Sequence, residues 1–196
     1  HMASNIADEV EGDLSSVYKD KLAGYTRSII YMKPDIMFIL DRVRGNGGHE
    51  YDWLFHAEHT GGKNSITRDN ETGRITITRS KSRLDMDVLA PDIASASISD
   101  SDRNESFITL KSEKGLEETT FLSVLNPRPG KKESTMKSSL IDEDTFIGAI
   151  VNHEKATDIV LFTRDGNTGG MKTESLEANA ERCAVRLDSR GKVEKA

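Results

Sequence analysis

The sequence predicts an all-β fold: an antiparallel two-sheet β-sandwich of about a dozen strands with one or two short helices. Three observations lead to this prediction. Apolar and β-branched residues recur with a short period along nearly the whole chain. Turn-forming residues separate these runs at roughly ten-residue spacing. Only the segments 13–22 and 176–181 carry helical spacing, and both are short.

The first two predicted strands are 26–32 and 35–43, joined by Lys33-Pro34, which predicts a tight connection. The second strand is apolar at odd and even positions alike, so we expect a central strand covered on both faces. Segment 44–48 (Arg-Gly-Asn-Gly-Gly) predicts a turn, and a strand over 49–57 follows it.

The middle and the end of the chain continue the same rhythm. Segment 70–73 (Asn-Glu-Thr-Gly) lies between strands 65–68 and 74–79 and predicts a hairpin. The polar, basic segment 127–141 predicts a long loop, which in a compact domain is either functional or mobile. Further strands are predicted at 83–89, 94–99, 106–111, 119–125, 146–152, 158–163 and 184–188.

Residues 1–4 have the composition of a cleaved expression-tag remnant, and residues 5–196 are predicted to form a single β-sandwich domain. The formal net charge of -6 argues against nucleic acid or an anionic membrane as a partner, because both need clustered Lys and Arg. An anionic polysaccharide stays compatible, since a local basic cleft could hold it. The single cysteine, Cys183, permits no intrachain disulfide and is expected to be a small buried hydrophobe.

Three histidines, His49, His56 and His59, lie among acidic residues and are of a type that binds zinc. On the predicted strand, however, His49 and His56 have opposite parity and should point to opposite faces. We therefore predict no metal site. His56 is expected to form a hydrogen bond inside the sheet, with His49 and His59 at its ends.

Asp41 interrupts the apolar run 36–43, and a buried carboxylate is costly unless it is paired. Its expected partners are Arg27, Arg42 or a histidine of a neighbouring strand. A structural ion pair is favoured over a catalytic role. Arg27, Asp41 and His56 are accordingly predicted as structural polar residues.

Two groups of residues are candidates for binding a saccharide. Tyr51, Trp53 and Phe55 share one face of the predicted strand and would stack on sugars if that face were open, although a period-two aromatic stripe is more typical of a core. The second group is the set of lysines in the predicted loop, which could hold an anionic substrate or form a solvated surface: Lys131, Lys132 and Lys137.

The order of several short segments resembles the heparinase II/III-like polysaccharide lyases. The most specific part runs from residue 13 to residue 56, and the resemblance continues to about residue 188. The matching segments are Asp13-Leu14-Ser15 with Tyr18, Tyr25-Thr26-Arg27-Ser28, Lys33-Pro34-Asp35, Asp41-Arg42-Val43, Tyr51-Asp52-Trp53, Phe55-His56, Arg83-Leu84, Leu89-Ala90-Pro91, 121–127 and 159–166.

Such enzymes carry an amino-terminal helical toroid followed by stacked antiparallel sheets, and they cleave uronic-acid polysaccharides by β-elimination. The resemblance implies that this chain is the carboxy-terminal sandwich. The catalytic and metal-binding motifs of such enzymes lie upstream of the matching stretch, so it implies no catalytic residue and no cofactor here. It also implies a toroid of the same polypeptide as partner and a periplasmic or extracellular location.

Two other functions remain open from the sequence. The chain could be a stand-alone carbohydrate-binding module for anionic glycans, or a sandwich that binds another protein. The second leaves the ordered resemblance unexplained.

Overall fold

The computed structural model describes residues 2–58, 66–101, 105–130, 133–154, 156–174 and 176–194. Within these ranges it contains seventeen strands and one three-residue 3-10 helix, η1 (Ser15–Val17), which confirms the all-β prediction. No helix in this part of the chain is long and apolar enough to cross a membrane.

The chain divides into two compact units. The central unit comprises residues 10–29 and 35–134, and the terminal unit comprises residues 1–9, 30–34 and 135–196. The prediction of one domain over residues 5–196 stays a prediction.

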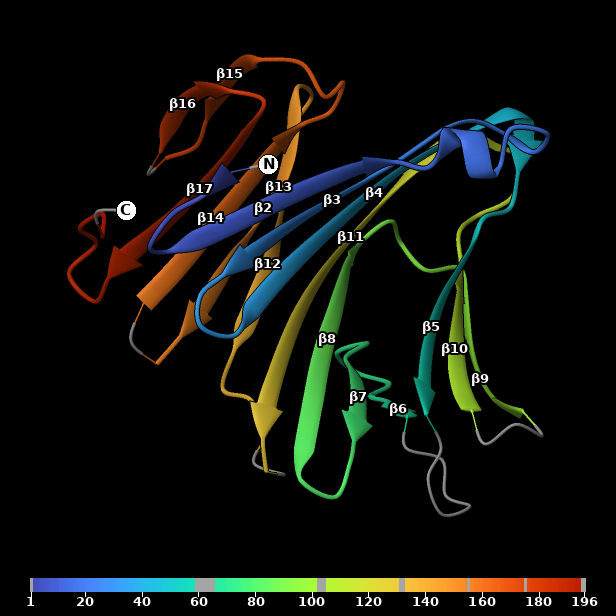
Figure 1. The fold of residues 1–196 in the computed structure, drawn as a ribbon, viewed down its shortest axis with the longest axis horizontal. Helices are drawn as coiled ribbons and strands as arrows, with labels where there is room; N and C mark the ends of the chain where they lie inside the picture. The colour runs from blue at the N-terminus through green and yellow to red at the C-terminus, as the bar shows by residue number, and fades with distance from the viewer. Residues whose placement is uncertain are drawn as a thin grey trace. The chain divides into compact units, whose positions relative to one another are not determined.

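The largest sheet has eight strands (Figure 1). Its strands pair in the order β1 (Met2–Ala3), β2 (Ala7–Asp13), β3 (Leu22–Met32), β4 (Ile36–His49), β11 (Leu116–Pro129), β8 (Ser82–Ala90), β7 (Ile75–Thr78) and β6 (Ile66–Arg68). β4 lies between β3 and β11, so the strand expected to be central is central. β6 and β7 pair antiparallel with Arg68 opposite Ile75, which is the hairpin expected around residues 70–73.

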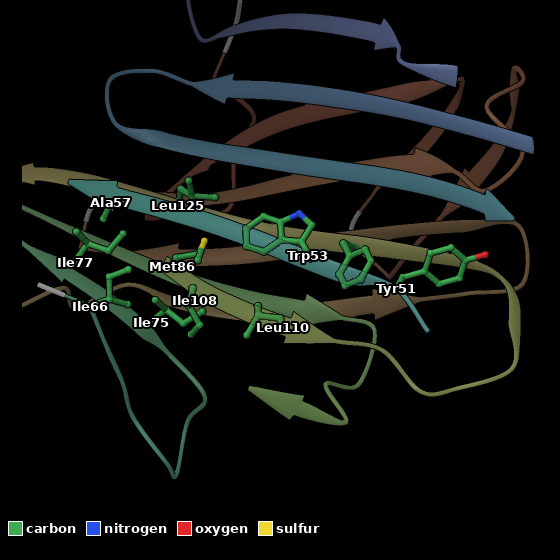
Figure 2. Close-up of a cluster of buried hydrophobic side chains, with 11 residues drawn as sticks. Tyr51, Trp53, Ala57, Ile66, Ile75, Ile77, Met86, Ile108, Leu110 and Leu125 are labelled. Carbon is green, nitrogen blue, oxygen red and sulfur yellow. The ribbon is translucent and has the colours of Figure 1, made fainter. Parts of the chain in front are cut away.

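A second sheet of the central unit contains β5 (Asp52–Glu58), β10 (Glu105–Lys111) and β9 (Ser95–Ser101). Alternate residues of β5 and β10, such as Trp53 and Ile108, pack against apolar residues of β6, β7, β8 and β11, such as Ile75 and Met86 (Figure 2). The period-two apolar pattern of these strands therefore forms a core between two layers, as a sandwich requires.

The terminal unit contains a sheet of β12 (Lys137–Asp142), β13 (Phe146–His153), β14 (Ala156–Thr163) and β17 (Arg182–Asp188). A hairpin of β15 (Gly169–Lys172) and β16 (Glu177–Ala180) packs Met171 on Phe146, Ile159 and Leu161. Buried Asp158 in this sheet accepts two hydrogen bonds from Arg186, Nε to Oδ1 at 2.6 Å and Nη2 to Oδ2 at 2.8 Å.

The turn predicted at 44–48 is wrong, because β4 continues to His49. Gly48 serves close backbone approach instead: a Cβ on it would lie 3.0 Å from the carbonyl oxygen of Gly115. The β4–β11 register also shifts between Leu116 and Glu118. The sequence pattern of 44–48 indicates a turn, but the glycines of this segment lie in strand β4, where its pairing with β11 is irregular.

Of the two segments predicted as helical, 13–22 contains a short helix, and the helix predicted at 176–181 is wrong. Only η1 forms in the first segment, and the second forms β16. In β16, Ala178 and Ala180 alternate with exposed residues and pack on the core of the terminal unit, so the period is two.

The predicted loop 127–141 is shorter than expected, because β11 extends to Pro129 and β12 begins at Lys137. Pairing of β11 with β4 ends at Leu125, whereas pairing with β8 continues to Pro129. A proline is tolerated in a strand that is paired on one side only, because its missing N–H can face the open side.

Candidate functional site

The buried polar centre of the central unit is the carboxylate of Asp41 on β4, which is 1% exposed. Arg27 forms a bidentate ion pair with it, donating from Nε to Oδ1 at 2.6 Å and from Nη2 to Oδ2 at 2.7 Å. Trp53 donates from Nε1 to Oδ2 at 2.9 Å, and the Tyr25 hydroxyl donates to Oδ1 at 3.4 Å. A buried charge with a bidentate cation and two further donors is compensated, so Asp41 is a satisfied group.

Strand periodicity explains how the four side chains meet. Tyr25 and Arg27 are two residues apart on β3 and therefore share a face. Asp41 lies on the neighbouring strand β4. Trp53 reaches the carboxylate from β5, in the other layer of the sandwich.

The surroundings of Tyr25 and Arg27 determine the protonation states of these two side chains. Burial, and next the negative charge of Asp41, raise the pKa of Tyr25 to about 12. The hydrogen bonds to Asp41 raise the pKa of Arg27 above its already high ordinary value. At neutral pH Tyr25 is thus a neutral hydrogen-bond donor and Arg27 is a cation, so neither is prepared to accept a proton.

A pocket of about 470 Å³ lies against this cluster. Its polar and charged lining includes Lys21, Arg27, Asp41, Glu50 and Asp52. Its apolar and aromatic lining comprises Leu14, Tyr18, Leu22, Tyr25, Val43, Tyr51, Trp53, Leu54 and Phe121.

Trp53 is a core residue, not an open stacking platform. It is 8% exposed, and its ring stacks on those of Phe55 and Phe121. The distances between ring centroids are 5.8 Å to Phe55 and 6.5 Å to Phe121. Figure 2 shows its ring among the side chains of the core, near Leu125 and Met86. Its one polar atom is engaged by Asp41, so only a small part of it is available to a ligand.

The histidines lie apart. The hydrogen bond expected for His56 inside the sheet is wrong: its side chain is on the exposed face of β5 and stacks on Phe107 at 5.4 Å. Strand parity explains this position, because Trp53 and Ala57, at the other parity, are the residues that point into the core. His49 ends β4 near Tyr51, and His59 lies outside the described residues. Among the residues that the structure describes, no three histidine, cysteine or acidic side chains form a group that could hold a metal.

Of the three candidate lysines, Lys137 is the first residue of β12 and is exposed in the terminal unit. Lys131 and Lys132 lie outside the described residues. The structure thus brings Arg27, Asp41 and Trp53 together, and places His56 on the opposite face of β5 from Trp53.

Sequence reasoning assigned no site role to Tyr18, Lys21 and Tyr25. Tyr25 had one usable signal, because it precedes Arg27 by two residues on the same strand and so must share its face. Tyr18 follows η1 directly, and its ring lies 5.6 Å from that of Tyr25. Nothing in the local pattern indicates this second contact.

A second polar cluster surrounds Asp85 on β8, which is fully buried. Arg83, Arg128 and Thr76 donate to its carboxylate at 2.8, 2.6 and 2.9 Å. Burial alone would raise the pKa of Asp85, but these hydrogen bonds and the arginine charges hold it below the ordinary value. Both arginines are engaged by this carboxylate and their side chains are only 17% exposed, so we assign the cluster to the scaffold.

Comparison with known proteins finds similar folds among solved structures. No family model and no curated protein matches the sequence. Among solved structures, heparan sulfate lyase HepC from Pedobacter heparinus matches with a TM-score of 0.63 and 15% identity, over 83% of this chain and 27% of that chain. A heparinase III structure matches with a TM-score of 0.62 and 16% identity, over 82% of this chain and 26% of that one. A heparinase III gene product matches with a TM-score of 0.60 and 11% identity, over 95% and 26%.

At these identities the likeness shows a shared fold. This chain has the fold of a heparinase-like β-domain, and it spans about a quarter of the length of the lyases that it matches.

Proposed function

We propose that this chain is the carboxy-terminal accessory sandwich of a heparinase II/III-type lyase, and that it is inactive by itself. The observation that carries the proposal is the unequal coverage of the structural match. Between 82% and 95% of this chain matches structures called heparinase III or heparan sulfate lyase, whereas only 26–27% of those chains is covered. A domain that resembles a quarter of a lyase is more simply a part of one than a complete enzyme.

The chemistry of β-elimination supports the second half of the proposal. The reaction needs a group that neutralises the uronate carboxylate, a base for the C5 proton and an acid for the leaving oxygen. Asp41 is engaged by Arg27, Tyr25 and Trp53, and the raised pKa of Tyr25 keeps its proton in place. In our proposal the base and the acid come from an amino-terminal helical toroid and earlier sheets of the same polypeptide, as would any metal.

An ultraviolet assay for the unsaturated uronate product tests the proposal on heparin, heparan sulfate, chondroitin and alginate. The isolated chain should produce no product above the buffer blank, while an authentic heparinase gives product in parallel. Time-dependent product that scales with the concentration of this chain would contradict the proposal.

The location follows from the same proposal. A lyase that acts on extracellular polysaccharide belongs in the periplasm or outside the cell. Fractionation of the native host with an antibody against this chain should therefore find the protein outside the cytoplasm.

A further inference from the structure

We infer that the pocket beside the Arg27–Asp41 pair, which we call the Tyr18 pocket after its exposed aromatic wall, binds a carboxylate-bearing sugar ring of a glycan chain. The inference rests on the proposed function, to which it adds a binding site on a domain otherwise treated as scaffold. The site differs from the candidates that the sequence suggested, because it relies on the exposed residues Tyr18 and Lys21 instead of Trp53 and the loop lysines.

The size and the walls of the pocket suit a saccharide. Its volume of about 470 Å³ is in the range of small-ligand sites. Tyr18 is 42% exposed and its ring is tilted by 54° against that of Tyr25, so the two rings form an angled aromatic wall. Leu54, which is 48% exposed, also lines the pocket. Aromatic and aliphatic walls accept the C–H faces of a pyranose and leave its edges free for polar contacts.

Arg27 supplies a positioned cation. Its Nε and Nη2 atoms bind Asp41, which locks the guanidinium, and its Cζ lies 5.9 Å from the centre of the Tyr25 ring. The side chain is nevertheless 37% exposed, and its Nη1 atom has no hydrogen-bond partner within the described part of the chain. A guanidinium edge held in place before binding loses little conformational entropy when an anion arrives.

Lys21 adds a positive charge at the same pocket. It is exposed, and it forms no ion pair with any residue that the structure describes. Asp41 offsets the charge of Arg27, so Lys21 leaves this side of the pocket with a net positive charge. A carboxylate between the Arg27 edge and the Lys21 ammonium is the complementary group.

The acidic residues of the pocket do not oppose this assignment. Glu50 and Asp52 are both held by Lys111, at 2.9 Å and 3.2 Å, and Glu50 also lies 3.7 Å from Lys114. Their negative charge is therefore largely offset by these two lysines. Carboxylate oxygens in such pairs can still accept hydrogen bonds from sugar hydroxyls.

The test uses this chain and an unsulfated glucuronate–N-acetylglucosamine oligosaccharide, so that sulfate plays no part. Binding is followed by calorimetry and by the fluorescence of Trp53, the single tryptophan of the chain, which also lines the pocket. We expect saturable binding that weakens at high salt. The same oligosaccharide with its carboxyl groups reduced to alcohols should bind at least several-fold more weakly.

Variants locate the site. Tyr18→Ala should weaken binding by about five- to tenfold through the loss of one stacking contact, while Tyr18→Phe should retain it. Lys21→Ala should weaken binding by roughly fivefold or less, as expected for one exposed charge contact. Lys19→Ala is the matched control, because Lys19 is an exposed lysine two residues away that does not line the pocket, and it should leave binding unchanged.

Three outcomes would overturn the inference: no binding by the wild-type chain, equal binding of the carboxyl-reduced oligosaccharide, or unchanged binding by both Tyr18→Ala and Lys21→Ala. A circular dichroism spectrum shows that each variant is folded. Failure here is distinct from failure of the proposed function, which is decided by the appearance of elimination product and not by affinity.

Discussion

Asp41 and Arg27 share one ion pair, but the two residues differ in their access to water. The carboxylate is 1% exposed, whereas the side chain of the arginine is 37% exposed. The sequence predicted this pair because a single acidic residue breaks an apolar run.

The sequence did not predict the cluster around Asp85, since in the segment Arg-Leu-Asp-Met-Asp an outward-facing aspartate is the ordinary expectation. The buried carboxylate of Asp85 accepts hydrogen bonds from Arg83 and Arg128, and Arg128 lies on a different strand, β11.

The unequal exposure of the pair predicts unequal costs of removing either partner. Arg27→Met leaves a buried carboxylate without its cation and should lower the free energy of unfolding by about 3 kcal/mol or more. Asp41→Asn leaves an arginine that can reach solvent and should cost about 1–2 kcal/mol. Urea unfolding followed by Trp53 fluorescence measures both. Lys172→Met, which breaks the exposed pair with Glu177, is the control and should not move the midpoint. Equal costs for the first two variants would refute the asymmetry.

Tyr25 predicts a feature of the alkaline unfolding profile. Its folded pKa of about 12 exceeds its ordinary value of 10.0, so the folded state favours the neutral phenol. The stabilisation is fully present below pH 10, and it is lost as the pH rises from about 10 through about 12. Tyr25→Phe cannot ionise and should lose less stability than wild type across this window. Parallel unfolding curves at a series of alkaline pH values provide the measurement, and identical losses would show that Tyr25 ionises as an exposed tyrosine does.

At the scale of strands, period two was the reliable signal and glycine was the misleading one. The runs 26–32, 83–89 and 158–163, which are rich in β-branched and apolar residues, all lie inside strands. Burial alternates along residues 28–32, whereas 158–163 is buried at every position. Segment 44–48 looks like a turn, yet β4 passes through it, since glycine also serves close backbone contact between strands. Local composition does not separate these two uses. β12 was missed for a related reason: an edge strand needs few apolar residues, and its polar residues read as a loop.

Gly148 in β13 predicts a large effect from a small change. A Cβ at this position would overlap the carbonyl oxygen of Val160 and would lie 3.0 Å from the Cα of Leu161, and backbone atoms cannot simply move aside. Gly148→Ala should therefore lower the free energy of unfolding by at least about 2 kcal/mol. Gly170→Ala is the matched control, because Gly170 is also a strand glycine and a Cβ there has nothing within 4 Å. It should change stability by less than about 1 kcal/mol. Thermal unfolding of both variants gives the comparison, and a tolerated Gly148→Ala would disprove the tight approach.

At the scale of the whole molecule, the sandwich and the function have different kinds of support. Strand periodicity predicts the sandwich from this chain alone, and the structure confirms it. The function comes from a fold shared with about a quarter of each matching lyase. The Tyr18 pocket could not be predicted from spacing, because it joins residues near η1 to residues of β5 that are about thirty positions later in the chain.

The measurement that tests the central claim most directly is peptide sequencing, by mass spectrometry, of the native polypeptide captured with an antibody against this chain. The account predicts a polypeptide several times larger than the 21.7 kDa of this chain. Its upstream part should contain a region of helical periodicity, ending in a histidine-bearing β segment. A native polypeptide of about 21.7 kDa, or one with an unrelated upstream domain, would contradict the account.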